Sequence, residues 1–276
     1  MSSRNKPLDK LAALGPAPFD RTLPPLLSCA HAMADLLHLL WLTLWLRPYV
    51  FAYFALFLLS GARELGWARL ALFTPLAWGL AWLTEFSSIH TGFPYGLYVY
   101  HHETVGRELW VGGVPFFDSL SYTFLAYASL CLALRRLGRG ASLPAAAALA
   151  GTFMLLQDVV IDPVAVRGNE WFLGDLFHYP GGGAYFGVPL TNFAGWWLTG
   201  CAICGGYLLL ERCLSPHLPP PPQPTRSYVT GVRLYFLIMG FNTALAFYIG
   251  EPFLGLAGLL VLAAAASLRP PRPAGA

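Results

Sequence analysis

The sequence is short of charged residues. Aspartate, glutamate, lysine and arginine make up 11% of its 276 residues, whereas 56% are hydrophobic, and a typical soluble domain carries roughly 25% charged residues. This deficit excludes an ordinary soluble globular domain and favours an integral membrane protein. The net charge is only +3, and no basic stripe indicates nucleic-acid binding.

Motifs for several common chemistries are also missing or incomplete. No serine or cysteine lies in a Gly-x-Ser-x-Gly context, which disfavours a nucleophilic hydrolase. Cys201 and Cys204 form a Cys-x-x-Cys pair without a second pair, so we interpret the five cysteines as packing residues. Residues 1–25 lack the apolar core of a signal peptide and are expected to form a cytosolic tail.

Long apolar runs dominate the rest of the chain. A membrane-spanning helix needs about 20 mostly apolar residues, and eight runs qualify, with a range of seven to nine because the breaks at Arg47-Pro48 and Glu251-Pro252 are tight. The first two runs are also consistent with one broken pair. We predict an all-α, polytopic membrane helix bundle in a single transmembrane domain, 26–268. The predicted spans are 26–46, 48–61, 68–86, 114–134, 144–162, 188–210, 229–249 and 252–268.

Arginines between the runs predict the orientation, because short cytosolic loops are rich in lysine and arginine. The strongest cluster is Arg135, Arg136 and Arg139. Placing it inside predicts that both termini, including a tail at 269–276, are cytosolic in a cell inner (cytoplasmic) membrane. The proline-rich run 216–224 is then a cytosolic linker. The loops 87–112 and 163–187 share the opposite face.

A Gly-Val-Pro motif occurs twice, at 113–115 and 187–189. Three residues after each proline stands a polar residue, Asp118 in the first copy and Asn192 in the second. A carboxylate precedes each copy at a similar distance, Glu85 before the first and Asp158 before the second. This pattern predicts a two-fold internal repeat with halves at about 68–134 and 144–210.

Five polar residues therefore lie at span ends on one face, and we interpret them as candidate catalytic residues because ionisable groups inside a membrane usually face a cavity. They are Glu85, Asp118, Asp158, Asp162 and Asn192. Simpler roles remain open for three of them. Asp162 precedes a proline, as turn residues often do, and Asp118 and Asn192 are placed to bind free amides in the first turn of a helix.

The histidines do not form the pattern of a metal site. His90, His101, His102 and His178, with Glu103, lie in the two loops on the acid-bearing face. Membrane di-iron hydroxylases instead present several histidine boxes with short internal spacing. We therefore predict no metal.

These residues resemble those of a known family. The segments that carry the resemblance are Glu85, Phe93-Pro94-Tyr95-Gly96, Tyr98-x-Tyr100, Gly113-Val114-Pro115, Asp158 with Asp162-Pro163, Trp171, and Tyr185-Phe-Gly-Val-Pro-Leu-x-Asn-Phe-x-Gly-Trp196. They are similar to the integral-membrane carotenoid hydratases, the family of the bisanhydrobacterioruberin hydratase and carotenoid 1,2-hydratase type, over about residues 70–250. The resemblance implies a hydro-lyase of carotenoid biosynthesis. Such an enzyme adds water, without a cofactor, across the terminal carbon 1–carbon 2 double bond of an acyclic carotenoid such as lycopene or a related C40 or C50 polyene, giving a tertiary alcohol.

The candidate residues suit this chemistry, which needs a proton donor, a stabilised cation and a positioned water. When two carboxyl groups lie close together in a buried site, one can stay protonated while the other is ionised. Our hypothesis is that Glu85 or Asp158 donates the proton and that the other, with Asp162 and Asn192, orients the water. Aromatic faces stabilise cations, although tryptophans are also typical interfacial anchors. The predicted substrate-binding residues are Tyr95, Tyr98, Trp171, Tyr185 and Trp196.

Three alternatives are compatible with the sequence. A lycopene-type cyclase forms a similar cation but closes a ring, and an iron-dependent carotenoid hydroxylase takes its oxygen from dioxygen. A small-molecule membrane transporter also combines paired halves with polar groups inside the membrane. The acids cluster towards one face rather than at the midplane, which favours an enzyme.

Overall fold

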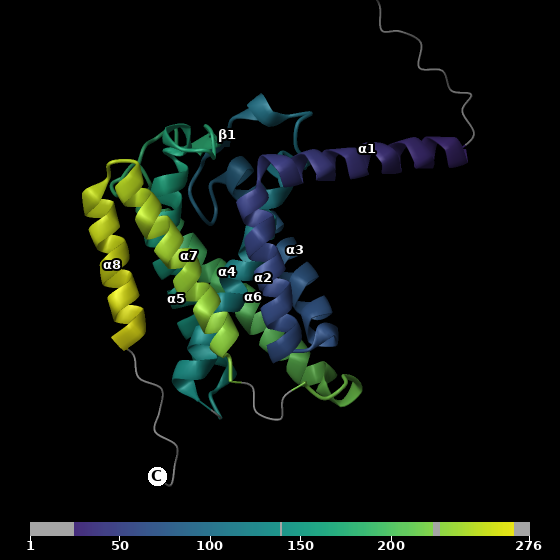
Figure 1. Ribbon diagram of the computed structural model, residues 1–276, viewed down its shortest axis with the longest axis vertical. Helices are drawn as coiled ribbons and strands as arrows, with labels where there is room; N and C mark the ends of the chain where they lie inside the picture. The colour runs from purple at the N-terminus through teal and green to yellow at the C-terminus, as the bar shows by residue number, and fades with distance from the viewer. Residues whose placement is uncertain (1–24, 139, 223–226, 268–276) are drawn as a thin grey trace, which may run out of the picture.

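The computed structural model describes residues 25–138, 140–222 and 227–267. The described chain forms eight α-helices and four short strands (Figure 1). The predicted tails lie outside these ranges apart from Pro25, and the predicted linker is described only as far as residue 222. The helices are α1 (Pro25–Leu46), α2 (Pro48–Glu64), α3 (Trp67–Thr91), α4 (Phe116–Leu137), α5 (Leu143–Ala165), α6 (Leu190–Leu214), α7 (Val229–Tyr248) and α8 (Pro252–Ser267).

The predicted all-α membrane architecture is confirmed for these residues. Within them, four stretches are long and apolar enough to cross a membrane: α4, α5, α7, and α6 extended to His217. The bent pair α1–α2 would make a fifth span. The count of eight spans stays a prediction, since α8 has only 16 residues and a full span needs about 20.

The first helix does not run beside the others. The axis of Ala32–Leu46 makes an angle of 98° with α2, and α1 extends sideways from one end of the bundle (Figure 1). Arg47 at the junction has a non-helical backbone, with φ −124° and ψ 49°, and Pro48 opens α2. A residue before proline avoids the helical conformation, so the sequence itself breaks the chain here. The predicted run 26–46 is therefore helical but is not a member of the bundle.

The most buried helix is α4, which contacts α2, α3, α5 and α7. The side chain of Gln157 on α5 donates to the carbonyl of Leu125, at 3.1 Å, and to Ser129 Oγ, at 2.6 Å. In an apolar bundle such interhelical hydrogen bonds, together with close packing, hold helices together. They fix α5 against α4.

Glycines allow α5 and α6 to approach closely. A Cβ atom on Gly151 would lie 2.7 Å from the carbonyl oxygen of Trp197, and one on Gly200 would lie 2.9 Å from the Cα of Gly151. Small residues at such crossings bring helix backbones together in membranes. This contact places the acid-bearing end of α5 next to the first turns of α6.

Two loops cover one end of the bundle, and we call them the cap, residues 92–115 and 166–189. They are joined by an antiparallel pair of strands, β1 (Val99–Tyr100) and β4 (Phe177–His178). A second pair, β2 (Trp110–Val111) and β3 (Val114–Pro115), lies within the first loop. Short 3-10 helices, η2 (His102–Thr104) and η3 (Gly168–Glu170), complete the cap. Each half of the predicted repeat thus contributes two helices and one cap loop, although the repeat itself stays a prediction.

A buried ion pair anchors the cap to the start of α2. The guanidinium of Arg47 contacts both carboxylate oxygens of Glu108, each at 3.1 Å, and also donates to the carbonyl of Leu173. Its Cζ lies 4.4 Å from the ring centroid of Phe117. One side chain therefore ties both cap loops to the break between α1 and α2.

We expect Glu108→Gln to lower the free energy of unfolding by about 3–5 kcal/mol, because it leaves the Arg47 charge buried without its partner. The matched control is Glu251→Gln, whose ion pair with Arg167 is 21% and 29% exposed and should be worth about 0–1 kcal/mol. Thermal unfolding of the full chain in detergent measures both. Equal effects would contradict this role of the Arg47–Glu108 pair.

Candidate active site

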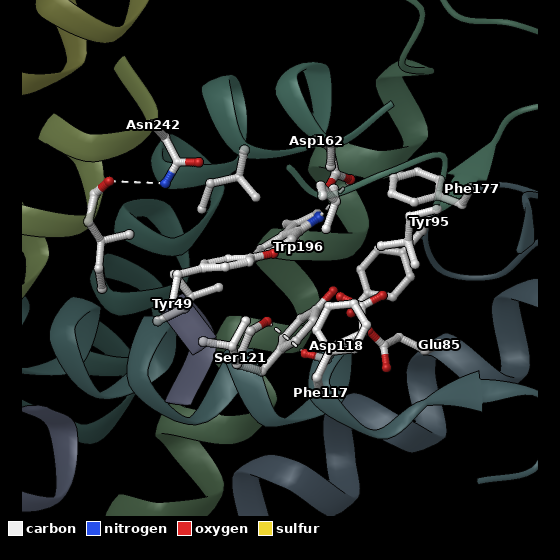
Figure 2. Close-up of a pocket in the computed structure, with 18 of the residues that line it drawn as sticks. Tyr49, Glu85, Tyr95, Phe117, Asp118, Ser121, Asp162, Phe177, Trp196 and Asn242 are labelled. Atoms are coloured by element: carbon white, nitrogen blue, oxygen red, sulfur yellow. Dashed lines mark hydrogen bonds between the residues drawn. The ribbon is translucent and has the colours of Figure 1, made fainter. Parts of the chain in front are cut away.

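A cavity lies beneath the cap, among the helix ends that adjoin it. Its volume is about 110 Å³, which is below the usual range of about 300–1,000 Å³ for small-molecule sites. Its walls come from α2 to α7 and from both cap loops. Figure 2 shows Glu85, Asp118 and Asp162 towards one end and Tyr49 and Asn242 towards the other.

The first group of acids comes from α3 and α4. Glu85 Oε2 accepts a hydrogen bond from Ser119, which lies beside Asp118 on α4. Tyr100 Oη donates to Asp118 Oδ2 at 2.5 Å. Glu85 and Asp118 both line the cavity, so each carboxyl group has one protein donor and also faces the empty space.

The second group comes from α5 and α6 and is centred on Asn192. Its Nδ2 donates at 2.7 Å to Asp158 Oδ2 and at 2.7 Å to Asp162 Oδ2. The indole of Trp196 also donates to Asp162 Oδ2, at 3.3 Å. Asp162 and Asn192 line the cavity, whereas Asp158 lies behind them with 0% exposure. The Oδ1 atom of Asp158 is buried without a hydrogen-bond partner in the structure.

The two Gly-Val-Pro motifs build these groups in the same way. Gly113 and Gly187 have φ of +83° and +87°, which glycine adopts without steric cost, and each following proline is the N-cap of a helix. Asp118 and Asn192 occupy the third helical position, but their side chains bond to Tyr100 and to the aspartates. The simpler role of binding first-turn amides is therefore not what the structure shows.

Asp162 does not form a turn either. The helix α5 continues through Pro163 to Ala165, so the carboxyl group is held on a regular helix, one turn after Asp158. This spacing places both carboxyl groups on the same face of α5. The turn interpretation of the Asp-Pro pair is thus wrong.

Aromatic rings form most of the remaining wall. Tyr122 and Trp196 are stacked with centroids 4.7 Å apart and an interplanar angle of 17°. Tyr95 packs against both, and its Oη bonds to Thr199 at 2.8 Å. The backbone of this turn fits because Gly195 has no side chain, since a Cβ there would lie 2.8 Å from the carbonyl of Pro94.

Tyrosines of the cap close the cavity from above. Tyr98 and Tyr100 lie edge-to-face with centroids 5.2 Å apart and are 6% and 4% exposed. Burial raises the pKa of both phenols well above the usual value because it disfavours the charged form. Both therefore stay protonated at neutral pH, and Tyr100 remains a hydrogen-bond donor to Asp118.

The structure brings together most of the residues selected from the sequence. All five candidate catalytic residues lie in the two hydrogen-bonded groups, although Asp158 does not reach the cavity wall. Four of the five predicted substrate-binding aromatics line the cavity: Tyr95, Tyr98, Trp171 and Trp196. Tyr185 does not, because its ring packs on Phe186 and Phe193 instead.

Several wall residues were missed in the sequence because they come from helices outside the predicted repeat. Tyr49 and Tyr53 lie on α2, and Phe241 and Asn242 lie on α7. Tyr122 was missed although it follows Asp118 by one helical turn. That spacing is the signal that would have identified Tyr122, whereas nothing local marks the residues of α2 and α7.

The histidines of the cap lie outside the cavity wall. His178 Nδ1 and His101 Nε2 are 3.0 Å apart across the β1–β4 pair, and Asp175 lies 3.6 Å from His101. Within the described ranges, no group of three or more histidine, cysteine, aspartate or glutamate residues has the geometry of a metal site.

Comparison with known proteins agrees with this arrangement. Residues 43–264 match the family model described as carotenoid biosynthesis protein. The chain belongs to this family. The matched region contains every residue of the cavity wall, so the site lies within the part that family members share.

One curated relative gives a more specific comparison. The chain is similar to bisanhydrobacterioruberin hydratase of Haloarcula japonica, with 33% identity over 139 residues. The match covers 50% of this chain and 43% of the relative, so the chain spans less than half of that relative's length. No solved structure is significantly similar.

We expect Asn192→Leu to lower the free energy of unfolding by about 1–3 kcal/mol, because it removes the shared donor of two buried aspartates. Asn242→Leu is the matched control, since the Asn242 amide donates at 3.0 Å to the carbonyl of Ile238 within its own helix. Thermal unfolding in detergent compares the two. A larger loss for Asn242→Leu would contradict the assignment of Asn192 as the shared donor.

Proposed function

We propose that this protein is a carotenoid hydratase, a hydro-lyase that adds water across the terminal double bond of an acyclic carotenoid end group. The observation that carries the proposal is the meeting of carboxyl groups from α3, α4 and α5 in one cavity with aromatic walls. The family supplies the carotenoid substrate class. The name of the Haloarcula japonica relative supports water addition in particular.

In the proposed first step, Glu85 transfers a proton to carbon 2 of the end group. Its Oε2 accepts from Ser119, so Oε1 is the oxygen that faces substrate. Protonation uses the electron pair of the double bond and leaves a tertiary cation at carbon 1. General acids of this kind contribute roughly 10²- to 10⁴-fold to the rate.

The cation forms beside the stacked pair of Tyr122 and Trp196. Their ring centroids are 4.7 Å apart, and Tyr95 packs against both. An aromatic face stabilises a desolvated cation by about 2 kcal/mol. These rings exclude bulk water and contribute no group that reacts with the cation.

In the proposed last step, water attacks carbon 1 and loses a proton to Asp162. Two donors, Asn192 and Trp196, hold Asp162 as an acceptor, which is the role that a base for water requires. The product is a tertiary alcohol. The proton taken up by Asp162 equals the one released by Glu85, and its return to Glu85 restores the starting state, so no other reactant is needed. Asp158 and Asn192 position Asp162.

We also propose that the cap faces away from the cytosol in the cytoplasmic membrane. The opposite end of the bundle carries Arg63, Arg69, Arg135, Arg136 and Arg212 at the ends of α2, α3, α4 and α6, as cytosolic ends do. The cytosolic location of both termini stays a prediction. The side of the membrane on which the N-terminus lies depends on the path of α1, which is bent by 98° from α2.

In a host that accumulates lycopene, we expect Glu85→Gln and Asp162→Asn each to lower the yield of hydrated carotenoid by about 10²- to 10⁴-fold, and Asp158→Asn to lower it less. Mass spectrometry of the pigments measures the gain of one water molecule. Asp175→Asn is the control, because that carboxyl is half exposed on the cap and does not line the cavity. Full activity of all three acid variants would rule out the mechanism.

The source of the oxygen atom distinguishes the rival enzymes. In isotopically labelled water, we expect the label to appear in the product alcohol, because water is the nucleophile. Labelled dioxygen should leave the product unlabelled. A product of unchanged mass with a ring would indicate a cyclase, and label from dioxygen would indicate an iron-dependent hydroxylase.

A further inference from the structure

The cavity, with a volume of about 110 Å³, is too small for a whole carotenoid, so the long apolar chain attached to the reacting end group must leave it. The cap blocks one direction, because Tyr98, Tyr100, Phe177 and Tyr179 are all at most 8% exposed. The close contact of α5 with α6 at Gly151 and Gly200 blocks another. The chain therefore needs an exit elsewhere.

Helices α2 and α7 form another part of the wall. They lie next to each other along one side of the bundle (Figure 1). Tyr49, Tyr53 and Phe241 line the cavity there and are only partly buried. The rings of Tyr53 and Phe241 have centroids 6.0 Å apart. Tyr49 of α2 and Asn242 of α7 lie at the end of the cavity opposite the acids (Figure 2).

A second hollow lies along the same two helices. It is lined by Leu56, Leu59, Ser60, Arg63, Thr230, Arg233, Leu234 and Leu237. Leu56 lies one helical turn beyond Tyr53 on α2, and Leu237 lies one turn from Phe241 on α7, so the hollow is the neighbour of the cavity on both helices. We call it the α2–α7 groove. From Tyr53 to Arg63 it extends the site by about 15 Å at 1.5 Å per helical residue.

The side chains of the groove suit an apolar chain inside a membrane. Leu56, Leu59 and Leu237 are 42%, 64% and 51% exposed, so their surface is open to lipid or to a ligand. The far end is marked by the cations of Arg63 and Arg233, which belong at the level of lipid headgroups. A chain in the groove would lie across the bilayer, parallel to the lipid acyl chains.

Another hollow offers a poorer exit. It shares Trp171 with the cavity and is lined by Asn169, Glu170, Phe172, Leu245 and Tyr248. Asn169 and Glu170 are exposed polar groups on the cap, which favour water over an apolar chain. The α2–α7 groove has no such groups until its far end.

We propose that the α2–α7 groove binds the polyene chain of the carotenoid while the end group lies among the acids of the cavity. This inference rests on the proposed function for its substrate class. It makes α2 and α7 part of the binding site and admits substrate sideways from the membrane. It also means that the protein selects a reacting end group that is attached to a long apolar chain.

Bulky substitutions in the groove test this proposal. Leu237→Trp and Leu56→Trp narrow it from opposite walls, and both positions are exposed enough to accept tryptophan. The control is Leu260→Trp on α8, where the leucine is 72% exposed and lines neither the cavity nor the groove. Full-length protein is purified from a lycopene-producing host, with Glu85→Gln added in one series so that bound pigment is not converted.

We expect each groove variant to retain roughly tenfold less lycopene per protein than the control, since part of the chain loses its buried contact. In the series with Glu85 intact, the yield of hydrated product should fall with it. Elution as a single species in detergent shows that a variant is folded. If one variant fails this test, the variant on the opposite wall of the groove decides the outcome. If both groove variants retain as much pigment and form as much hydrated product as the Leu260→Trp control, the proposal that the groove binds the polyene chain is wrong.

The same experiment separates this inference from the proposed function. If the Leu56 and Leu237 variants bind less pigment but the wild type forms no hydrated product, the hydratase proposal is refuted and the groove proposal is supported. Hydration by the wild type that neither groove variant reduces would refute the groove and support the hydratase. Absence of both pigment and product in the wild type would contradict both.

Discussion

The arrangement of this bundle depends on supplying hydrogen-bond donors to carboxyl groups buried among apolar helices. An unpaired polar group in such surroundings costs several kcal/mol, so each acid must meet a partner from another element. Asn192 serves two acids of α5 at once, and Ser119 and Tyr100 serve Glu85 and Asp118. These bonds fix the relative positions of α3 to α6, and the cavity is the space that they enclose.

The same constraint explains why the acids divide into a layer that faces the cavity and a layer behind it. Glu85, Asp118 and Asp162 have one side bonded to protein and one side facing the cavity. Asp158 lies one helical turn deeper and is hydrogen-bonded to Asn192. In the proposed hydratase, a donor and an acceptor must face the substrate from different helices, and the supporting residues hold that separation.

Much of this was predictable because polarity within an apolar chain is a strong signal. The eight helices begin and end within five residues of the boundaries expected from the apolar runs, since hydrophobic length and proline breaks control both. The five candidate catalytic residues were found for the same reason. Tyr185 illustrates the limit, because its motif is distinctive but its ring packs against Phe186 and Phe193 outside the cavity.

By itself, the sequence determined the membrane class, the helix positions, the break at Arg47-Pro48 and the polar residues that meet beneath the cap. Tertiary structure alone decided that α1 leaves the bundle at 98°, that Asp158 lies behind Asn192, and that α2 and α7 complete the cavity. The physical reason is that composition and periodicity indicate which residues avoid lipid and which avoid water. Which helix faces which neighbour depends instead on contacts between distant segments, such as Arg47 with Glu108 and Gly151 with Gly200.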